Sequence, residues 1–333
     1  MLPELFTIPF LNISIQSYGT MMALGFVFAV MLARHLAKKQ NENPEIIMNF
    51  ALWAMLCGVG GARLFHAIHH HQEYDSFIEF FMVWKGGLEF LGGVIATIIF
   101  AFFYFRKLKK SVLKFFDILA PALMIGLAFG RVGCLMNGCC FGATTDKPWA
   151  ITFPAINYRT DNAPGKQKNK EPQYSHPFYH QLVSDPQRRP GKGPLLELPE
   201  EYYQSGYDEN NDKVRYPIAP SELPEKQLHD LKCGCYKMHP IHPTQIYSTI
   251  NGLLAAGVLL LLMRRKKFHG MITAAMLIWY GIARFILESL RADNPIEKTG
   301  FTISQNLGIL SVLIGLGLLI YLYKTQPRLN TKK

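Results

Sequence analysis

The stretch TQIYSTINGLLAAGVLLLLMRRKK, residues 244–267, places a long apolar run directly before four consecutive basic residues. A helix needs about 20 mostly apolar residues to cross the hydrocarbon core of a bilayer. Basic clusters beside such runs mark the cytoplasmic side of the membrane. We therefore interpret this stretch as a membrane-spanning helix whose C-terminal end lies in the cytoplasm.

The same pattern recurs along the 333-residue chain, in which 49% of the residues are hydrophobic. The predicted spanning helices are residues 18–37, 46–68, 92–105, 115–136, 244–263, 271–290 and 303–323, with residues 88–91 dipping into the interface. The sequence thus predicts an all-α integral membrane protein with seven transmembrane helices.

Basic clusters set the orientation. They follow the first, third, fifth and seventh runs, always on the same side, and include Lys38, Lys39, Arg106, Lys107, Arg264, Arg265 and Lys324. The positive-inside pattern predicts an outside N-terminus and a cytoplasmic C-terminus. It also accounts for the net charge of +11, so we expect no nucleic-acid partner.

Residues 143–243 differ from the rest, because they are polar and hold most of the 20 prolines. We expect an extracytoplasmic inserted segment here, either a small α+β subdomain or a long structured arm. The predicted organisation is residues 1–142 with helices one to four and a lipid site, the insertion at 143–243, and residues 244–333 with helices five to seven.

Charged side chains inside spanning helices are energetically costly and point to function. Four lie late in the second, fourth and sixth helices, towards the outer leaflet: Arg63, Arg131, Arg284 and Glu288. Arg284 and Glu288 are four residues apart, so they share a helical face and can pair. Guanidinium groups suit phosphate because they are planar and always charged. The set predicts a site for an anionic lipid headgroup.

The structural alternatives stay open for individual residues. An arginine near a helix end can simply extend its charge to the interface. Glycines in membrane helices often serve close packing, which we expect of Gly58, Gly60 and Gly61. His69, His70 and His71 have no regular ligand spacing, so we expect a solvated loop rather than a metal site.

Several motifs together carry a family resemblance. They are Ser17-Tyr18-Gly19, GARL at 61–64, GGLEFLGG at 86–93, GRVGCLMNG at 130–138 followed by Gly142, HPTQIY at 242–247, and YGIARFILE at 280–288 followed by Arg291. Across all seven predicted helices the chain resembles the bacterial prolipoprotein diacylglyceryl transferases.

The resemblance implies an activity. Members transfer the diacylglyceryl group of phosphatidylglycerol to the lipobox cysteine of a prolipoprotein signal peptide, in the bacterial inner membrane, and release glycerol phosphate without a metal or organic cofactor. It implies catalytic roles for Arg131, Asn137, Tyr280, Arg284 and Glu288. It implies substrate binding by Tyr18, Arg63, Gly86, Gly87, Gly92, Gly93, Gly133, Gly142, His242 and Arg291.

Within that reaction, Arg131 and Arg284 are expected to neutralise the leaving phosphate, with Asn137 as a hydrogen-bond donor. Glu288 is expected to orient Arg284; the alternative is that it accepts the thiol proton. The chain departs from the family at Leu91, where a histidine is often found, and leucine cannot donate or accept a hydrogen bond.

Leu91 keeps a second function open, a non-catalytic lipid- or lipoprotein-binding protein with the same fold. A transporter is a weaker alternative, because the polar residues cluster near the outer ends of the helices rather than at the midplane, and no inverted repeat is visible.

Four cysteines bracket the insertion: Cys139 and Cys140 before it, Cys233 and Cys235 after it. All four are predicted on the outside, where disulfides can persist. We hypothesise a disulfide between the two pairs; the alternative is four free thiols. A zinc site formed by Cys233, Cys235, His239 and His242 is disfavoured, because His242 already belongs to a family motif.

Overall fold

The computed structural model describes residues 2–8, 13–71, 80–81, 87–160, 170–174, 198–207, 213–233, 235–236, 239–291 and 300–328. The chain divides into two compact units. The first comprises Met1–Phe26, Met124–Ala255 and Leu277–Leu316, and the second comprises Val27–Leu123, Ala256–Met276 and Gly317–Lys333.

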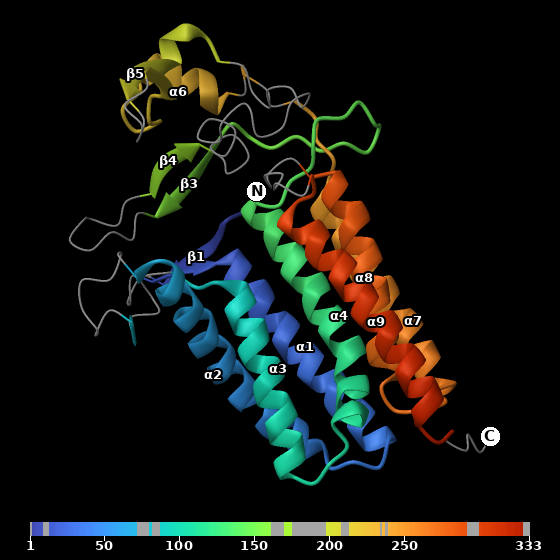
Figure 1. Ribbon diagram of the computed structural model, residues 1–333. Helices are drawn as coiled ribbons and strands as arrows, with labels where there is room; N and C mark the ends of the chain where they lie inside the picture. Colours follow the sequence, from blue (N-terminus) through green and yellow to red (C-terminus); the bar gives the residue numbers. More distant parts are fainter. Residues whose placement is uncertain are drawn as a thin grey trace. The chain divides into compact units, whose positions relative to one another are not determined.

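Seven long helices are the main elements of the chain (Figure 1). They are α1 (Ser17–Lys39), α2 (Pro44–His69), α3 (Phe90–Lys107), α4 (Val112–Asn137), α7 (Thr244–Arg264), α8 (Met271–Ser289) and α9 (Ile303–Thr325). All seven are long and apolar enough to cross a membrane. The seven predicted spans are therefore confirmed, with ends that differ by a few residues.

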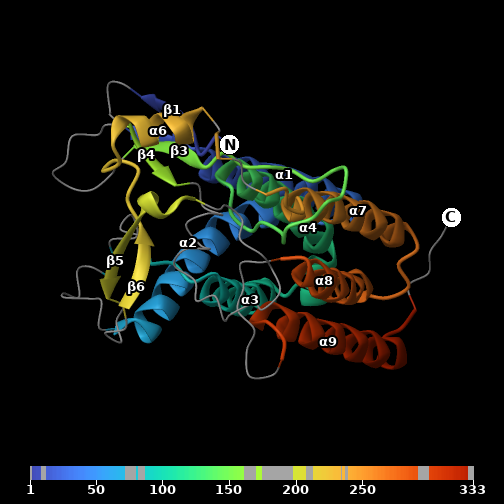
Figure 2. The ribbon, with the colours of Figure 1, turned by 90° about the horizontal axis from the view of Figure 1, so that it is seen from above.

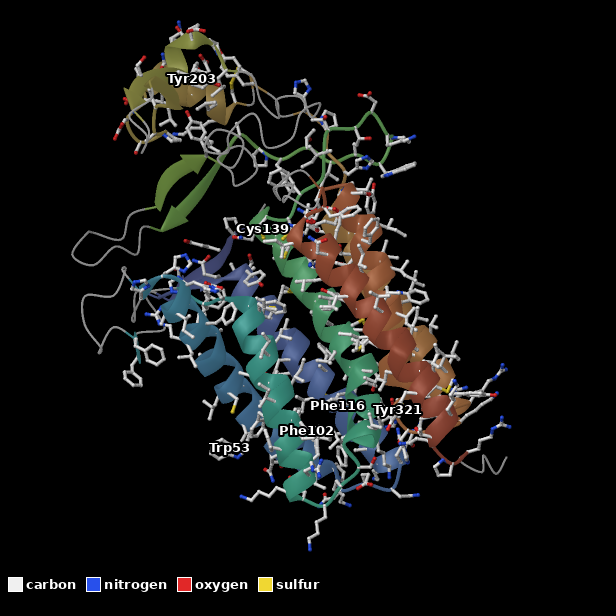
Figure 3. The ribbon with its side chains drawn as sticks, in the orientation of Figure 1. Trp53, Phe102, Phe116, Cys139, Tyr203 and Tyr321 are labelled. Atoms are coloured by element: carbon white, nitrogen blue, oxygen red, sulfur yellow. A yellow bond between two sulfur atoms is a disulfide. The ribbon has the colours of Figure 1, made fainter. Side chains whose placement is uncertain are left out.

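The outer surfaces of these helices are apolar. Trp53 on α2 is 56% exposed and Phe103 on α3 is 64% exposed, and Figure 3 shows Trp53 on its helix. Large apolar side chains that point outward along every spanning helix are costly in water and favourable in lipid. The distribution supports a protein that is surrounded by hydrocarbon.

Glycines allow α2 and α3 to pack closely in the second unit. A Cβ atom on Gly61 would lie 2.8 Å from the backbone oxygen of Gly92, and one on Gly93 would lie 2.9 Å from the oxygen of Gly58. Small residues are what membrane helices use to approach each other. The packing prediction is confirmed for Gly58 and Gly61, but it is wrong for Gly60, which faces open space.

A buried carboxylate holds the start of α8 in the second unit. Asp117 of α4 is fully buried and accepts hydrogen bonds from the backbone nitrogens of Gly270 (2.8 Å) and Thr273 (2.9 Å). Lys266 approaches it at 3.4 Å. The first N–H groups of a helix have no acceptor within the helix, and negative charge is favourable there. The Asp117 carboxylate accepts their hydrogen bonds and so caps α8. Sequence reasoning missed this intramembrane charge.

The basic ends of several helices meet in the second unit. Lys110 and Lys114 pair with Glu42 at 2.8 and 2.6 Å, and Lys266 donates to the side chain of Gln40 at 3.1 Å. The ends of α1 and α7 and the start of α4 therefore lie together, as the charge pattern requires. Which side of the membrane they face stays a prediction.

Short strands complete the first unit. A hairpin of β1 (Glu4–Ile8) and β2 (Ile13–Gln16), which the sequence analysis did not predict, precedes α1. The insertion contains the pair β3 (Ile156–Thr160) and β4 (Lys170–Tyr174), the 3-10 helix η5 (Glu200–Tyr202), the pair β5 (Tyr203–Tyr207) and β6 (Lys213–Pro217), and α6 (Glu225–Lys232). Figure 2 shows the second of these pairs from above.

An apolar core joins the insertion to the exit of α4. Fully buried Tyr202 packs there with Phe153, Leu231 and Ile241 of the insertion and with Phe141, which follows α4. Strands, a helix and a shared core confirm the α+β interpretation for the described residues. The boundaries 1–142, 143–243 and 244–333 stay predictions, since the compact units cut across the helices.

The cysteines correct one hypothesis. Cys233 and Cys235 form a disulfide with each other, while Cys139 and Cys140 are free. The predicted bridge between the pairs is therefore wrong, and so is the alternative of four free thiols. The turn after α6 brings the Cα atoms of Cys233 and Cys235 to 5.7 Å, within the usual disulfide range. Bonded to each other, they offer no thiolates to zinc.

Candidate functional site

The polar residues of α8 lie on one face of the helix. Tyr280, Arg284 and Glu288 follow each other at intervals of four residues, which stacks their side chains. The neighbouring helix α9 comes close because glycines meet: a Cβ on Gly308 would lie 2.9 Å from the backbone oxygen of Gly281. Figure 1 shows the two helices side by side.

Glu288 is the centre of this polar cluster. Its side chain is fully buried, and one carboxylate oxygen lies 3.2 Å from Arg284 Nη2 and 3.5 Å from Arg291 Nη1. The hydroxyl of Thr302 donates to the other oxygen at 3.3 Å. Arg284 Nη2 also donates to Ser304 Oγ at 2.6 Å. The carboxylate therefore fixes two guanidinium groups, and each donor comes from a described helix or its end.

This arrangement bears on the role of Glu288. A buried carboxylate is tolerated when it is paired and hydrogen-bonded, and removing a partner leaves an uncompensated charge. Donors occupy both of its oxygens, and two of those donors are cationic. The geometry favours a role for Glu288 in positioning Arg284 over a role as the base.

Arg131 joins the cluster as a third guanidinium group. It lies within electrostatic range of Arg284, as do Arg291 and Tyr280. Within the described residues, no ion pair joins Arg131 to an acidic side chain. Arg131 therefore adds a positive charge near the ion pair of Arg284 and Glu288. Such a charge suits an anion such as a phosphodiester.

Gly142 forms a corner between three segments. Its backbone nitrogen donates to the oxygen of His242 at 3.1 Å, and the next nitrogen, of Ala143, donates to Leu290 at 2.8 Å. Gly142 also forms a backbone bridge with Arg291. A Cβ here would clash with the backbone of His242. Gly142 thus has a packing role, which holds the exit of α4 against the end of α8.

His242 itself lies beside Tyr247. Its Nδ1 is 3.2 Å from the hydroxyl of Tyr247, which also accepts a hydrogen bond from Trp149 Nε1 at 2.6 Å. The histidine therefore has polar partners at the start of α7.

The exit of α4 is a tight turn. Gly138 has φ +78° and Cys140 has φ +61°, a left-handed conformation that is uncommon outside glycine. The first residues of α7 hold this turn: Thr244 Oγ1 donates to the oxygen of Cys140 at 2.7 Å, and Gln245 Nε2 donates to that of Cys139 at 2.8 Å. Figure 3 shows Cys139 at this end of α4.

Three thiols gather at this turn. Cys134, Cys139 and Cys140 lie within 4.8 Å of one another. The pKa of Cys140 is lowered by its interactions with the thiols of Cys134 and Cys139 and by the positive charges of Arg291 and Arg131. Sequence reasoning placed Asn137 in the reaction, but its side chain here interacts with the thiol of Cys139.

Tyr18 and Gly133 lie next to this turn. Tyr18 is within electrostatic range of the three thiols and of Arg131. A Cβ on Gly133 would lie 3.1 Å from the Tyr18 ring, so Gly133 lets α4 pack against α1. Tyr18 is therefore close enough to Arg131 to interact electrostatically, and its role in headgroup binding stays a prediction.

A second polar cluster lies in the second unit. Arg63 is only 5% exposed, and its guanidinium donates to the backbone oxygens of Phe80 (3.0 Å) and Gly87 (3.1 Å). Gly87 has φ +69°, and a Cβ on it would clash with that guanidinium. Arg63 therefore binds the backbone at Phe80 and Gly87 instead of extending into water. Gly86 lies outside the described residues.

Histidines of α2 belong to this second cluster. His69 and His70 are exposed, as expected, but both pair with Glu89, at 3.0 and 3.3 Å. Sequence reasoning missed Glu89, although an acidic residue just before an apolar run is a recognisable signal. Leu91 follows Glu89 by two residues, on α3, and is 40% exposed.

The predicted residues thus fall into two groups. Four of the five predicted catalytic residues form one electrostatic cluster in the first unit: Arg131, Tyr280, Arg284 and Glu288. The same unit contains Asn137, Tyr18, Gly133, Gly142, His242 and Arg291, whereas Arg63, Gly87, Gly92 and Gly93 belong to the second unit. Their roles in binding or reaction stay predictions.

Comparison with known proteins gives a consistent result. Residues 3–321 match the model of a family described as prolipoprotein diacylglyceryl transferase. Three similar proteins are named phosphatidylglycerol–prolipoprotein diacylglyceryl transferase. They come from Clostridium tetani (25% identical, covering 95% of this chain and 96% of the relative), Burkholderia orbicola (26%; 94% and 92%) and Photorhabdus laumondii (27%; 94% and 90%).

Proposed function

The chain belongs to the prolipoprotein diacylglyceryl transferase family, and we propose that the cluster around Glu288 is the place where it binds phosphatidylglycerol. The chain is a multi-pass bacterial membrane enzyme. It transfers the diacylglyceryl group of phosphatidylglycerol to a prolipoprotein, as its named relatives do.

The reaction is an alkyl transfer. The cysteine sulfur of the prolipoprotein bonds to the C3 carbon of the diacylglyceryl group, and the bond from that carbon to the phosphate oxygen breaks. The thiol proton leaves, and glycerol phosphate departs with both electrons of the broken bond. Negative charge therefore grows on the phosphate, so a fixed positive charge at that place lowers the barrier.

Arg284 and Arg131 are suited to this task in different ways. Glu288 and Ser304 hold Arg284 in one orientation, so its remaining N–H groups can face the phosphate without first being ordered. Arg131 has no acidic partner in the described part of the chain, so the phosphate would be its counter-ion. Both guanidinium groups stay charged throughout.

The observation that carries this proposal is the position of Arg131. It is half-buried and within electrostatic range of Arg284, and no acidic side chain among the described residues forms an ion pair with it. A half-buried cation without a counter-ion is costly, and a phosphodiester would compensate it. Tyr18, at the start of α1 and within electrostatic range of Arg131, is a further candidate for contact with the headgroup.

The non-catalytic alternative rested on Leu91 and is not favoured. The family match spans residues 3–321, and the relatives named above are all transferases. The buried pairing of Arg284 with Glu288 does not depend on residue 91. Leucine at that position excludes only that one side chain as a base.

A direct assay tests the proposal. The purified protein in detergent receives radiolabelled phosphatidylglycerol and a lipobox peptide, and the product is measured by mass. A peptide heavier by one diacylglyceryl group is expected, and a peptide whose cysteine is replaced by serine serves as the control. If the peptide mass does not change while a known family member is active in parallel, the proposal fails.

A further inference from the structure

We propose that Cys134, Cys139 and Cys140 form a binding site for a thiophilic divalent cation of the Zn²⁺ class, with one coordination position left open. The three sulfur atoms lie within 4.8 Å of one another. A tetrahedral zinc site with Zn–S distances of about 2.3 Å places its sulfurs about 3.8 Å apart. The three thiols therefore need to close by about 1 Å or less.

The backbone holds the ligands in place. Cys134 projects from the last turns of α4, and the other two follow the left-handed turn at Gly138. The carbonyl groups of Cys139 and Cys140 accept hydrogen bonds from Gln245 and Thr244 at 2.8 and 2.7 Å. A site whose backbone is already fixed loses less conformational entropy on binding.

The charges around the cluster suit a metal–thiolate complex. A divalent cation with three thiolates carries one net negative charge. Arg131 and Arg291 lie within electrostatic range of Cys140, and Asn137 interacts with Cys139. Positive side chains would stabilise the resulting anion. Zinc bound by three protein ligands keeps its fourth coordination position open for water or another small ligand.

A vicinal disulfide is the obvious competitor, and geometry opposes it. Across a trans peptide bond, the Cα atoms of Cys139 and Cys140 are about 3.8 Å apart, below the usual range of about 4.4–6.8 Å for a disulfide. The chain contains no cis peptide bond among its described residues. All three thiols are free, and soft thiolate sets select metals such as zinc.

The experiment uses the full-length protein in detergent, reduced and freed of metal. Reduction also opens the Cys233–Cys235 disulfide, and Cys233 lies near His229 and Asp230, so a Cys233→Ser/Cys235→Ser background removes that competing site. Cd²⁺ and Zn²⁺ are then titrated. The readouts are the thiolate-to-cadmium charge-transfer absorption and the metal content per chain.

One metal ion per chain is expected. Cys139→Ser and Cys140→Ser should each weaken metal binding by at least about 10-fold. Loss of a residue that only supports a ligand already costs about 10- to 100-fold in metal affinity, and loss of a direct ligand should cost no less. Cys57→Ser, which removes a free thiol of α2, is the matched control and should change nothing. The inference is overturned by a protein that binds no metal. Binding that survives in the Cys134→Ser/Cys139→Ser/Cys140→Ser variant, or native mass spectrometry that shows Cys134 in a disulfide, also overturns it.

Discussion

Arg284 offers the sharpest test of the phosphate site. Arg284→Ala removes a guanidinium whose Nη2 lies 3.2 Å from Glu288 and 2.6 Å from Ser304. Loss of one preorganised donor to a developing charge typically costs about 10²- to 10³-fold in rate, or about 2.7–4 kcal/mol. We expect a loss of that size in the initial rate of peptide lipidation.

The structure also predicts that this variant folds. Breaking a buried ion pair usually costs about 3–5 kcal/mol. Here Glu288 keeps Arg291 at 3.5 Å and Thr302 at 3.3 Å, so the loss in free energy of unfolding should fall below that range. Thermal unfolding in detergent, measured on the same preparation, separates a lost reaction from a lost fold.

Two further variants test whether the geometry of the guanidinium matters and whether the loss is specific to this site. Arg284→Lys keeps the charge but loses the planar fork that reaches two partners, so we expect it to be nearly as damaging as Arg284→Ala. Arg34→Ala is the matched control: its pair with Glu45 has a similar distance of 3.4 Å, but the two side chains are 39% and 63% exposed. Exposed pairs of this kind contribute little.

Activity of folded Arg284→Ala within about threefold of the wild type, a barrier change under about 1 kcal/mol, would refute the phosphate role. Loss of activity in Arg34→Ala as well would point to general damage instead.

Three other predictions follow from the same structure. Glu288→Gln should reduce the rate by about 10-fold, the difference between a charged and a neutral hydrogen bond, with an unchanged pH profile; loss of the acidic limb of that profile would instead identify Glu288 as the base. Cysteine substituted for exposed Trp149 should react with an impermeant reagent from outside, and cysteine substituted for exposed Arg265 only from inside; labelling of both from one side would overturn the topology. Asp117→Ala should lower the free energy of unfolding by about 3–5 kcal/mol, because a buried lysine loses its partner; a melting temperature equal to that of wild type would contradict the role of this carboxylate.

The sequence predicted the helices well because helix formation in lipid depends on each segment separately. In lipid, each backbone N–H and C=O must be satisfied within the segment, so a long apolar run has few alternatives to a helix. The bounds of α7 (Thr244–Arg264) and α8 (Met271–Ser289) therefore lie within one residue of the predicted ends. The pairing of Arg284 with Glu288 was also readable, because residues four apart on a helix are neighbours.

Other features depended on segments that are distant along the chain. The sequence suggested neither the cap that Asp117 provides for α8 nor the pairing of Glu89 with the histidines of α2. It also predicted the wrong cysteine pairing, since spacing does not show which way a turn directs its sulfurs. These contacts exist only once two helices or loops have packed.

The composition of each segment thus determined which parts cross the membrane, while packing alone decided which polar side chains meet. Hydrophobic transfer acts on each run separately and can be summed along the sequence. An ion pair or a thiol cluster instead needs atoms within a few ångströms. Tertiary structure therefore decided two contacts. Thr302, just before α9, donates a hydrogen bond to Glu288 of α8, and Gln245 of α7 donates one to the turn after α4.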